Sequence, residues 1–305
     1  MLRYVIKRLI GAIPTLFIII TLSFFLMRLA PGGPFSRERA LPPEIEANLL
    51  KAYHLDDPLW LQFLNYLGDL AHGDFGPSFK YKDFSVGELI WGGFPTSALV
   101  GGIAILLALG IGICAGTYAA LKQNSRLDYS TMGFAMVGIA VPNFVIAPLL
   151  TFFISLKMGW LPVGGWGQLK HMILPVIALA LPQIAAIARL TRGSMIEVLR
   201  SNFVRTARSK GLPEQVTVTR HALKAAMLPV VSYLGPAVAG IITGSVIIEQ
   251  IFGIPGIGRY FVQAALNRDY TLVMGVTIFY GVLIILLNLL ADIIYGFLDP
   301  KIRYE

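Results

Sequence analysis

NFVRTARSKGLPEQVTVTRHALKAAMLP, residues 202–229, is the stretch that organises the rest of the chain. It is a basic, mostly polar segment between two long apolar runs, in a chain of 305 residues that is 56% hydrophobic. Each of its cations would cost about 3 kcal/mol at the centre of a bilayer, so they cannot lie in lipid. These cations are Arg205, Arg208, Lys210, Arg220 and Lys224. The stretch therefore marks a point where a membrane-embedded chain emerges into water.

Residues 202–229, which we call the basic hairpin, also carry the signals of two short helices. Apolar residues interrupt the charges throughout: Ala207, Leu212, Val216, Val218, Ala222 and Leu223. Gly211 can end one helix, and Pro213 can begin the next. Two short helices at the membrane surface would form a rigid unit that another protein could hold. From composition alone, a basic loop that only follows the positive-inside rule is an equally good interpretation.

Composition places the whole chain in a membrane, because mean hydropathy is +0.70 and only 14% of the residues are charged. Six uncharged segments are long enough to cross the hydrocarbon, which takes about 20 helical residues. They are Leu9 to Met27, Ala98 to Leu121, Thr131 to Leu156, Met172 to Ala188, Ala225 to Ile248 and Tyr270 to Ala291. We therefore predict an all-α polytopic membrane protein with six transmembrane helices.

The distribution of Lys and Arg predicts that both termini lie in the cytoplasm. With the N-terminus inside, the inner segments carry fourteen of these residues and the short outer loops carry four. Inner loops of membrane proteins are enriched in Lys and Arg, whereas a long loop such as the first one is translocated regardless of charge. The net charge of +8 follows from this asymmetry. We therefore expect contact with membrane lipid and no nucleic-acid binding.

Nothing in the sequence indicates a cofactor, a metal site or a catalytic residue. Cys114 is the only cysteine and lies in an apolar run, so no disulfide can form within the chain. The histidines lack the spacing of metal ligands: His54, His72, His171 and His221. The glycine cluster at residues 253–258 lacks the Gly-Lys-Ser/Thr ending of a phosphate-binding loop, and no Walker A motif occurs elsewhere.

Prolines and acids near the spans give further predictions. Pro142 in the third span and Pro236 in the fifth permit bends, although either could be a simple packing kink. Glu249 and Asp292 are the acids nearest the membrane core. Each lies within about one turn of a predicted interface, so we expect both to be solvated or paired with Arg.

Small and polar residues predict close packing and a helix start. Gly112-x-x-x-Gly116 and Gly240-x-x-x-Gly244 have the spacing that lets two helices approach closely. Ser194, followed by Glu197, has the spacing of a capping box for a helix that leads into the basic hairpin. A second outer helix is expected after Pro58, preceded by one from residues 42–54. Packing against the outer ends of the spans is its favoured role, and contact with an external substrate-delivering protein is the alternative.

RTARSKG, residues 205–211, followed by RHAL, residues 220–223, resembles the coupling loop of permease subunits in binding-protein-dependent ABC importers. The general form of that loop is Glu-Ala-Ala, three residues, Gly, and nine residues before Ile-x-Leu-Pro. Gly211 takes the position of the Gly, Ala207 that of the second Ala, and Leu223 that of the Leu.

Three positions depart from the general form: Arg205 stands in place of Glu, Thr206 in place of the first Ala, and Lys224 where Pro is expected. This altered version is similar to the oligopeptide and dipeptide branch of the family. Residues 72–86 and 244–275 resemble that branch as well.

The resemblance implies a type I ABC importer permease fold and a subunit that translocates oligopeptides across the cytoplasmic (inner) membrane of a bacterium. It implies as partners a second homologous permease subunit, two cytoplasmic ABC ATPase subunits, a periplasmic peptide-binding protein and the peptide. It places the ATPase contact on Arg205, Thr206, Ala207, Arg208, Lys210, Gly211 and Leu212. The cations would meet acidic or polar ATPase groups, and Ala207 and Gly211 would allow close backbone contact. Import of dipeptides, nickel or another small solute stays open.

The resemblance also divides the chain. Residues 1–30 hold an amphipathic start and the first transmembrane helix, and residues 31–93 form a periplasmic loop region with short helices. Residues 94–292 form the ABC transmembrane type-1 permease core, with the coupling helix at about 203–213, and residues 293–305 form a cytoplasmic tail.

Two other classes of protein fit the residues poorly. A transporter driven by ions needs acids buried in mid-span, and the six predicted spans have none. A polytopic membrane enzyme needs His, Asp, Ser or Cys residues that converge near one interface, and none cluster. Because the sequence has no ATP-binding motif, energy for transport would have to come from a partner.

Overall fold

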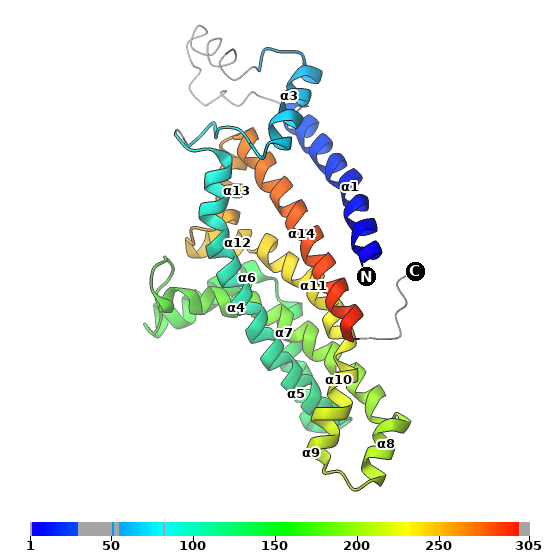
Figure 1. The fold of residues 1–305 in the computed structure, drawn as a ribbon. Helices are drawn as coiled ribbons and strands as arrows, with labels where there is room; N and C mark the ends of the chain where they lie inside the picture. The colour runs from blue at the N-terminus through cyan, green and yellow to red at the C-terminus, as the bar shows by residue number, and fades with distance from the viewer. Residues whose placement is uncertain (1, 30–50, 52–54, 82, 299–305) are drawn as a thin grey trace.

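The computed structural model describes residues 2–29, 51, 55–81 and 83–298, and in this part of the chain helices are joined by turns and loops (Figure 1). In chain order, the first elements are α1 (Leu2–Leu29), α3 (Leu59–Ala71), α4 (Val86–Leu121), α5 (Arg126–Ala140), α6 (Asn143–Leu150) and η1 (Thr151–Lys157). Then follow α7 (Leu169–Leu199), α8 (Asn202–Ser209), α9 (Glu214–Val216), η2 (Thr217–Ala222) and α10 (Leu223–Ala226). The last elements are α11 (Leu228–Gly244), α12 (Val246–Phe252), α13 (Ile257–Leu266) and α14 (Tyr270–Leu298). The elements η1 and η2 are π-helical.

Six spans can be counted in the described residues when each bent pair of helices is one span. Four unbroken helices are long and apolar enough to cross a membrane: Val5–Leu29, Val86–Leu121, Leu169–Leu199 and Tyr270–Ile294. Two bent pairs of helices are long and apolar enough when each pair is taken as one span. They are Arg126–Ala140 with Asn143–Lys157, bent by 104°, and Glu214–Ala226 with Leu228–Thr243, bent by 53°. The predicted all-α fold with six transmembrane helices is therefore confirmed.

The two bends have local causes. In the third span the chain breaks at Val141, and Pro142 is the residue before the first turn of α6, as predicted. In the fifth span the break is at Met227, just before Pro229 in the first turn of α11. Pro236 lies inside α11, which continues unbroken to Gly244. Pro236 therefore does not break the fifth span, and the break lies earlier, at Met227.

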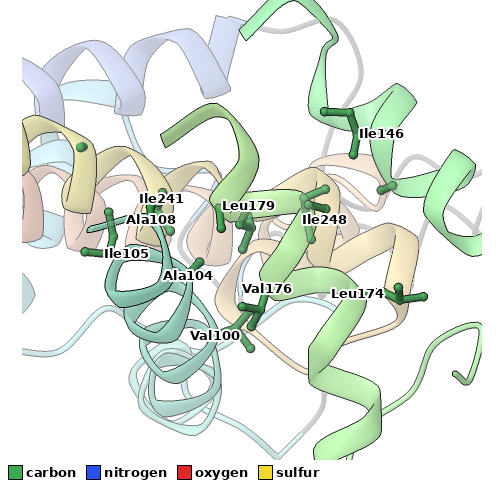
Figure 2. Packing of buried hydrophobic residues seen from close by; sticks show 14 of the residues in the cluster. Val100, Ala104, Ile105, Ala108, Ile146, Leu174, Val176, Leu179, Ile241 and Ile248 are labelled. Atoms are coloured by element: carbon green, nitrogen blue, oxygen red, sulfur yellow. The ribbon is translucent and has the colours of Figure 1, made fainter. Parts of the chain in front are cut away.

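The main core lies where α4, α7, α11 and α12 meet (Figure 2). Val100 and Ala104 of α4 face Val176 of α7 there. The glycines at 112 and 116 let these two helices touch: a Cβ on Gly112 would lie 2.8 Å from Ile187, and one on Gly116 would meet the α7 backbone. The close packing expected of this pair is confirmed. Gly240, in contrast, has no atom within 4 Å of an added Cβ.

Helix α3 packs on the outer end of α1, as the favoured interpretation held. The ring of Phe63 lies 5.2 Å from that of Phe24, and Arg28 donates a 2.8 Å hydrogen bond from Nε to Oε1 of Gln62. Pro58 precedes the first helical residue of α3 instead of being that residue. The helix expected at residues 42–54 falls outside the described residues.

Candidate functional site

The basic hairpin forms two helical arms joined by a tight turn at the end of the molecule far from α3 (Figure 1). Arm one is α8, and arm two runs through α9, η2 and α10. Gly211 has a φ of +78°, which favours glycine, and its N–H donates to the carbonyl of Arg208 at 2.9 Å. The N–H of Leu212 reaches back to the carbonyl of Ala207 at 3.4 Å. This is the Schellman helix ending, so the predicted stop at Gly211 and restart after Pro213 are confirmed.

The hairpin has its own small apolar core, which joins it to two spans. Its buried members are Val204 of α8, Val218 and Ala222 of η2, Ala226 of α10, Met195 of α7 and Ala120 of α4. Val204 and Met195 are fully buried. Because interiors are closely packed, a displacement of the hairpin acts directly on α4 and α7. Helix α10 also leads into α11 after the bend at Met227.

The residues predicted to contact an ATPase divide into exposed and buried positions. Exposed positions are taken by Arg205, Thr206, Arg208, Lys210 and Gly211, and Leu212 is half-buried. Ala207 is only 6% exposed and lies one turn from Val204 on the inner face. The small side chain of Ala207 therefore packs within the chain.

Arg208 is paired inside the hairpin. It donates two hydrogen bonds to Glu214, 3.1 Å from Nε to Oε2 and 2.6 Å from Nη2 to Oε1. This bond to Glu214 raises the pKa of Arg208 above its ordinary value. The pair closes the turn between the two arms, so Arg208 does not offer an uncompensated charge to a partner. Arg205 and Lys210 have no ion-pair partner among the residues described here.

A buried ion pair that the sequence analysis missed lies beside the hairpin. Arg192 of α7 donates from Nε and Nη2 to the two carboxylate oxygens of Asp128, each at 2.6 Å. Asp128, in the first turn of α5, is 1% exposed and also accepts from the N–H of Asn124 at 2.9 Å. The pair fixes the turn between α4 and α5 to α7. A weak signal was available, since Ser125 followed by Asp128 is a helix-start pattern.

The two acids near the membrane core behave differently. Asp292 is paired with Arg8 at 2.7 Å, as expected. Glu249 is fully buried, and no ion pair joins it to a described cation: it accepts from Ser245 Oγ at 2.5 Å and from the N–H of Gly258 at 2.8 Å. The expectation of a solvated or Arg-paired Glu249 is therefore wrong. The reason is that α11 ends at Gly244, four residues before the predicted end of the span, and α12 turns Glu249 inward.

The described residues contain no group of three or more His, Cys, Asp or Glu side chains able to hold a metal ion. What this region offers is mechanical: an exposed, basic hairpin that shares a buried apolar cluster with two membrane-spanning helices.

Comparison with solved structures shows the fold. The MetNI methionine ABC transporter, in an inward-facing conformation, aligns with a TM-score of 0.57 at 15% identity, covering 69% of this chain and 96% of that chain. The crystal structure of an amino acid ABC transporter with histidines aligns with a TM-score of 0.52 at 18% identity, covering 68% and 92%. The predicted type I ABC importer permease fold is confirmed by these matches.

Comparison with curated proteins finds similarity over the full length. The oligopeptide transport system permease protein OppB of Salmonella typhimurium is 60% identical over 306 residues, with 100% of both chains covered. The OppB protein of Haemophilus influenzae is 56% identical over the same coverage. The dipeptide transport system permease protein DppB of Bacillus subtilis is 45% identical over 303 residues, covering 99% of this chain and 98% of that one.

Two family models match the chain. Residues 112–304 match the binding-protein-dependent transport system inner membrane component, and residues 1–91 match the N-terminal part of the membrane component of such systems. The predicted family and the multi-pass location in a bacterial inner membrane are thereby confirmed. The chain belongs to the family of binding-protein-dependent transport system inner membrane components, and it is the membrane-spanning permease subunit of an ABC importer.

Proposed function

We propose that this chain carries oligopeptides across the cytoplasmic membrane, with the energy supplied by ATP hydrolysis on partner subunits. The substrate class is supported by full-length similarity to proteins named for oligopeptide transport, at 60% and 56% identity. Dipeptides are the second candidate, because a dipeptide permease is 45% identical. Transport of nickel or another small solute instead of peptides is a further alternative, which a transport assay can distinguish.

The single observation that carries the mechanism is the packing of the basic hairpin. It is exposed on its outer face, and its inner face is continuous with the cores of α4 and α7 through Val204 and Met195. When an ATPase subunit bound to the exposed face moves, the close packing would transmit its displacement directly to these spans. In this proposal Arg205 and Lys210 meet acidic groups of the ATPase, while Gly211 allows close approach at the turn.

A second, homologous permease subunit would complete the transport path. Helix α11 exposes a line of small side chains at a spacing of four residues, formed by Ser232, Pro236 and Gly240. Such a line allows another helix, or a substrate backbone, to come close. We assign this face of α11 to the second permease and the peptide path. Each of the two permeases would present one hairpin, so two ATPase subunits would bind.

The proposal includes an orientation and a delivery protein. Both termini lie in the cytoplasm, on the same side as the hairpin, which agrees with the excess of Lys and Arg on that side. The outer region that contains α3 then faces a periplasmic peptide-binding protein.

The test is transport by the complete importer in sealed vesicles. The chain is reconstituted with the second permease, the ATPases and the binding protein, and uptake of labelled peptides of two to five residues and of nickel is measured. We expect ATP-dependent accumulation of peptides longer than two residues. Accumulation of dipeptides or nickel alone would refute the substrate class, and accumulation by the chain without ATPases would refute the mechanism.

A further inference from the structure

A cavity of about 490 Å³ lies between α1 and α14 near the ends of these helices that carry Arg8 and Asp292. Its wall includes the polar or charged residues Lys7, Arg8, Thr15 and Asn288, and the apolar residues Leu9 and Ile285. None of these residues belongs to the basic hairpin or to the exposed face of α11. Below, this space is called the α1–α14 cavity.

The charged residues lie at one end of the cavity, and the residues further in are uncharged. Arg8 pairs with Asp292 at the interface, with their N and O atoms 2.7 Å apart. Asn288 lies one helical turn further into α14, and Thr15 lies about 10 Å further along α1 at 1.5 Å per residue. The cavity therefore begins among cations at the membrane surface and continues about two turns into the hydrocarbon. A ligand that fits this gradient has an anionic head and an apolar tail.

Two polar side chains at the cavity lack partners within the described chain. The ammonium group of Lys7 is exposed and has no ion pair or hydrogen bond there. The amide of Asn288 likewise has no hydrogen-bond partner among described residues. In hydrocarbon, an amide without a partner is costly, because no water can replace the missing hydrogen bond. A phosphate near Lys7 and an ester carbonyl near Asn288 would satisfy both groups.

The cavity is also open to the bilayer. Only 6% of the apolar window of α1 is buried, and neighbouring side chains such as Ile10 and Ile13 are 61% and 65% exposed. Basic pockets between transmembrane helices on the cytoplasmic side bind the headgroups of anionic lipids. A helix of another protein at this place would have to bring an acid to Lys7, whereas the lipid leaflet already supplies the negative charge.

We propose that the α1–α14 cavity binds one anionic phospholipid from the cytoplasmic leaflet. Its phosphate lies at Lys7, beside the Arg8–Asp292 pair, its glycerol region lies at Asn288, and one acyl chain lies deeper, along Ile285. The bound lipid holds α1 against α14. This inference depends on the cytoplasmic position of the N-terminus proposed above.

The test measures lipid binding to the purified, delipidated full-length chain by native mass spectrometry. Phosphatidylglycerol and phosphatidylcholine with identical acyl chains are titrated separately. We expect phosphatidylglycerol to bind at least tenfold more tightly. Lys7→Gln and Asn288→Leu should each weaken this binding at least fivefold, and Lys7→Arg should retain it. Lys122→Gln is the matched control, because it removes an exposed cation at the inner end of α4, outside the cavity.

Further outcomes decide against the proposal. Equal affinity for the two lipids, or unchanged binding in Lys7→Gln, would overturn it. Competition by inorganic phosphate alone would assign the cavity to a free anion, and loss of the lipid on assembly with the second permease would assign it to that subunit. Labelling of Lys7→Cys from one membrane side, in a Cys114→Ser background, tests the orientation separately, so the two failures can be told apart.

Discussion

Val204→Ala should uncouple ATP hydrolysis from transport by loosening the basic hairpin. Val204 of α8 is fully buried in the cluster that it forms with residues of α7 and η2. The substitution removes two methyl groups, each worth about 0.8 kcal/mol of burial, so the docked state of α8 loses about 1.6 kcal/mol. At 25 °C this raises the population of the undocked hairpin roughly 15-fold. The α8 backbone amides should exchange hydrogen correspondingly faster, while the membrane spans should be unaffected.

Two measurements test this prediction on the assembled importer. Hydrogen exchange followed by mass spectrometry reports the docking of α8, and the ratio of peptide transported to ATP hydrolysed reports coupling. We expect faster exchange together with a lower ratio. Val163→Ala is the control, since Val163 is 51% exposed and lies outside the hairpin. Normal coupling in the presence of faster exchange would show that the docking of α8 does not transmit the ATPase movement.

Three further substitutions test buried contacts outside the basic hairpin. Gly116→Ala should lower the free energy of unfolding by about 1–3 kcal/mol, because its methyl group meets the α7 backbone; Gly102→Ala, with nothing within 4 Å, is the control in a thermal-melting assay. Asp128→Asn should cost about 3 kcal/mol, the lower end for a broken buried pair, because Arg192 keeps some access to water. Replacing both partners with Leu should recover most of that loss, and an equally unstable double variant would contradict the assignment. Glu249→Leu should cost about 2 kcal/mol or more, because two buried donors lose their acceptor; an unchanged melting temperature would contradict this.

Features fixed by local chemistry could be predicted from the sequence. The spans follow from uninterrupted apolar runs, the break in the third span follows from the missing N–H of Pro142, and the hairpin turn follows from Gly211. Each depends on residues that are neighbours along the chain.

Features decided by packing could not be predicted in this way. The capping box expected at Ser194 and Glu197 is wrong, because α7 continues without a break to Leu199 and Met195 is fully buried in the hairpin core. A pattern of capping residues has no effect where tertiary contacts keep the helix going. The pairing of Asp128 with Arg192, 64 residues apart, likewise depends on which helices touch.

The candidate site contains features of both kinds, those fixed by local chemistry and those decided by packing. The outward positions of Arg205 and Lys210 follow from the polarity of α8, and the inward position of Ala207 follows from its spacing to Val204. The pairing of Arg208 with Glu214 became visible only once the turn between the two arms was known. Which of the exposed residues an ATPase contacts stays a prediction.

Cross-linking from position 210 tests that prediction most directly. Lys210→Cys in a Cys114→Ser background is assembled with the second permease and the ATPases and treated with a short bifunctional thiol reagent. If the ATPase movement reaches the spans through the basic hairpin, the Lys210→Cys variant should be cross-linked to an ATPase subunit. The control variant Lys157→Cys, at the end of η1, should not be. A cross-link from position 157, or none from position 210 in a complex that still transports peptide, would contradict the account.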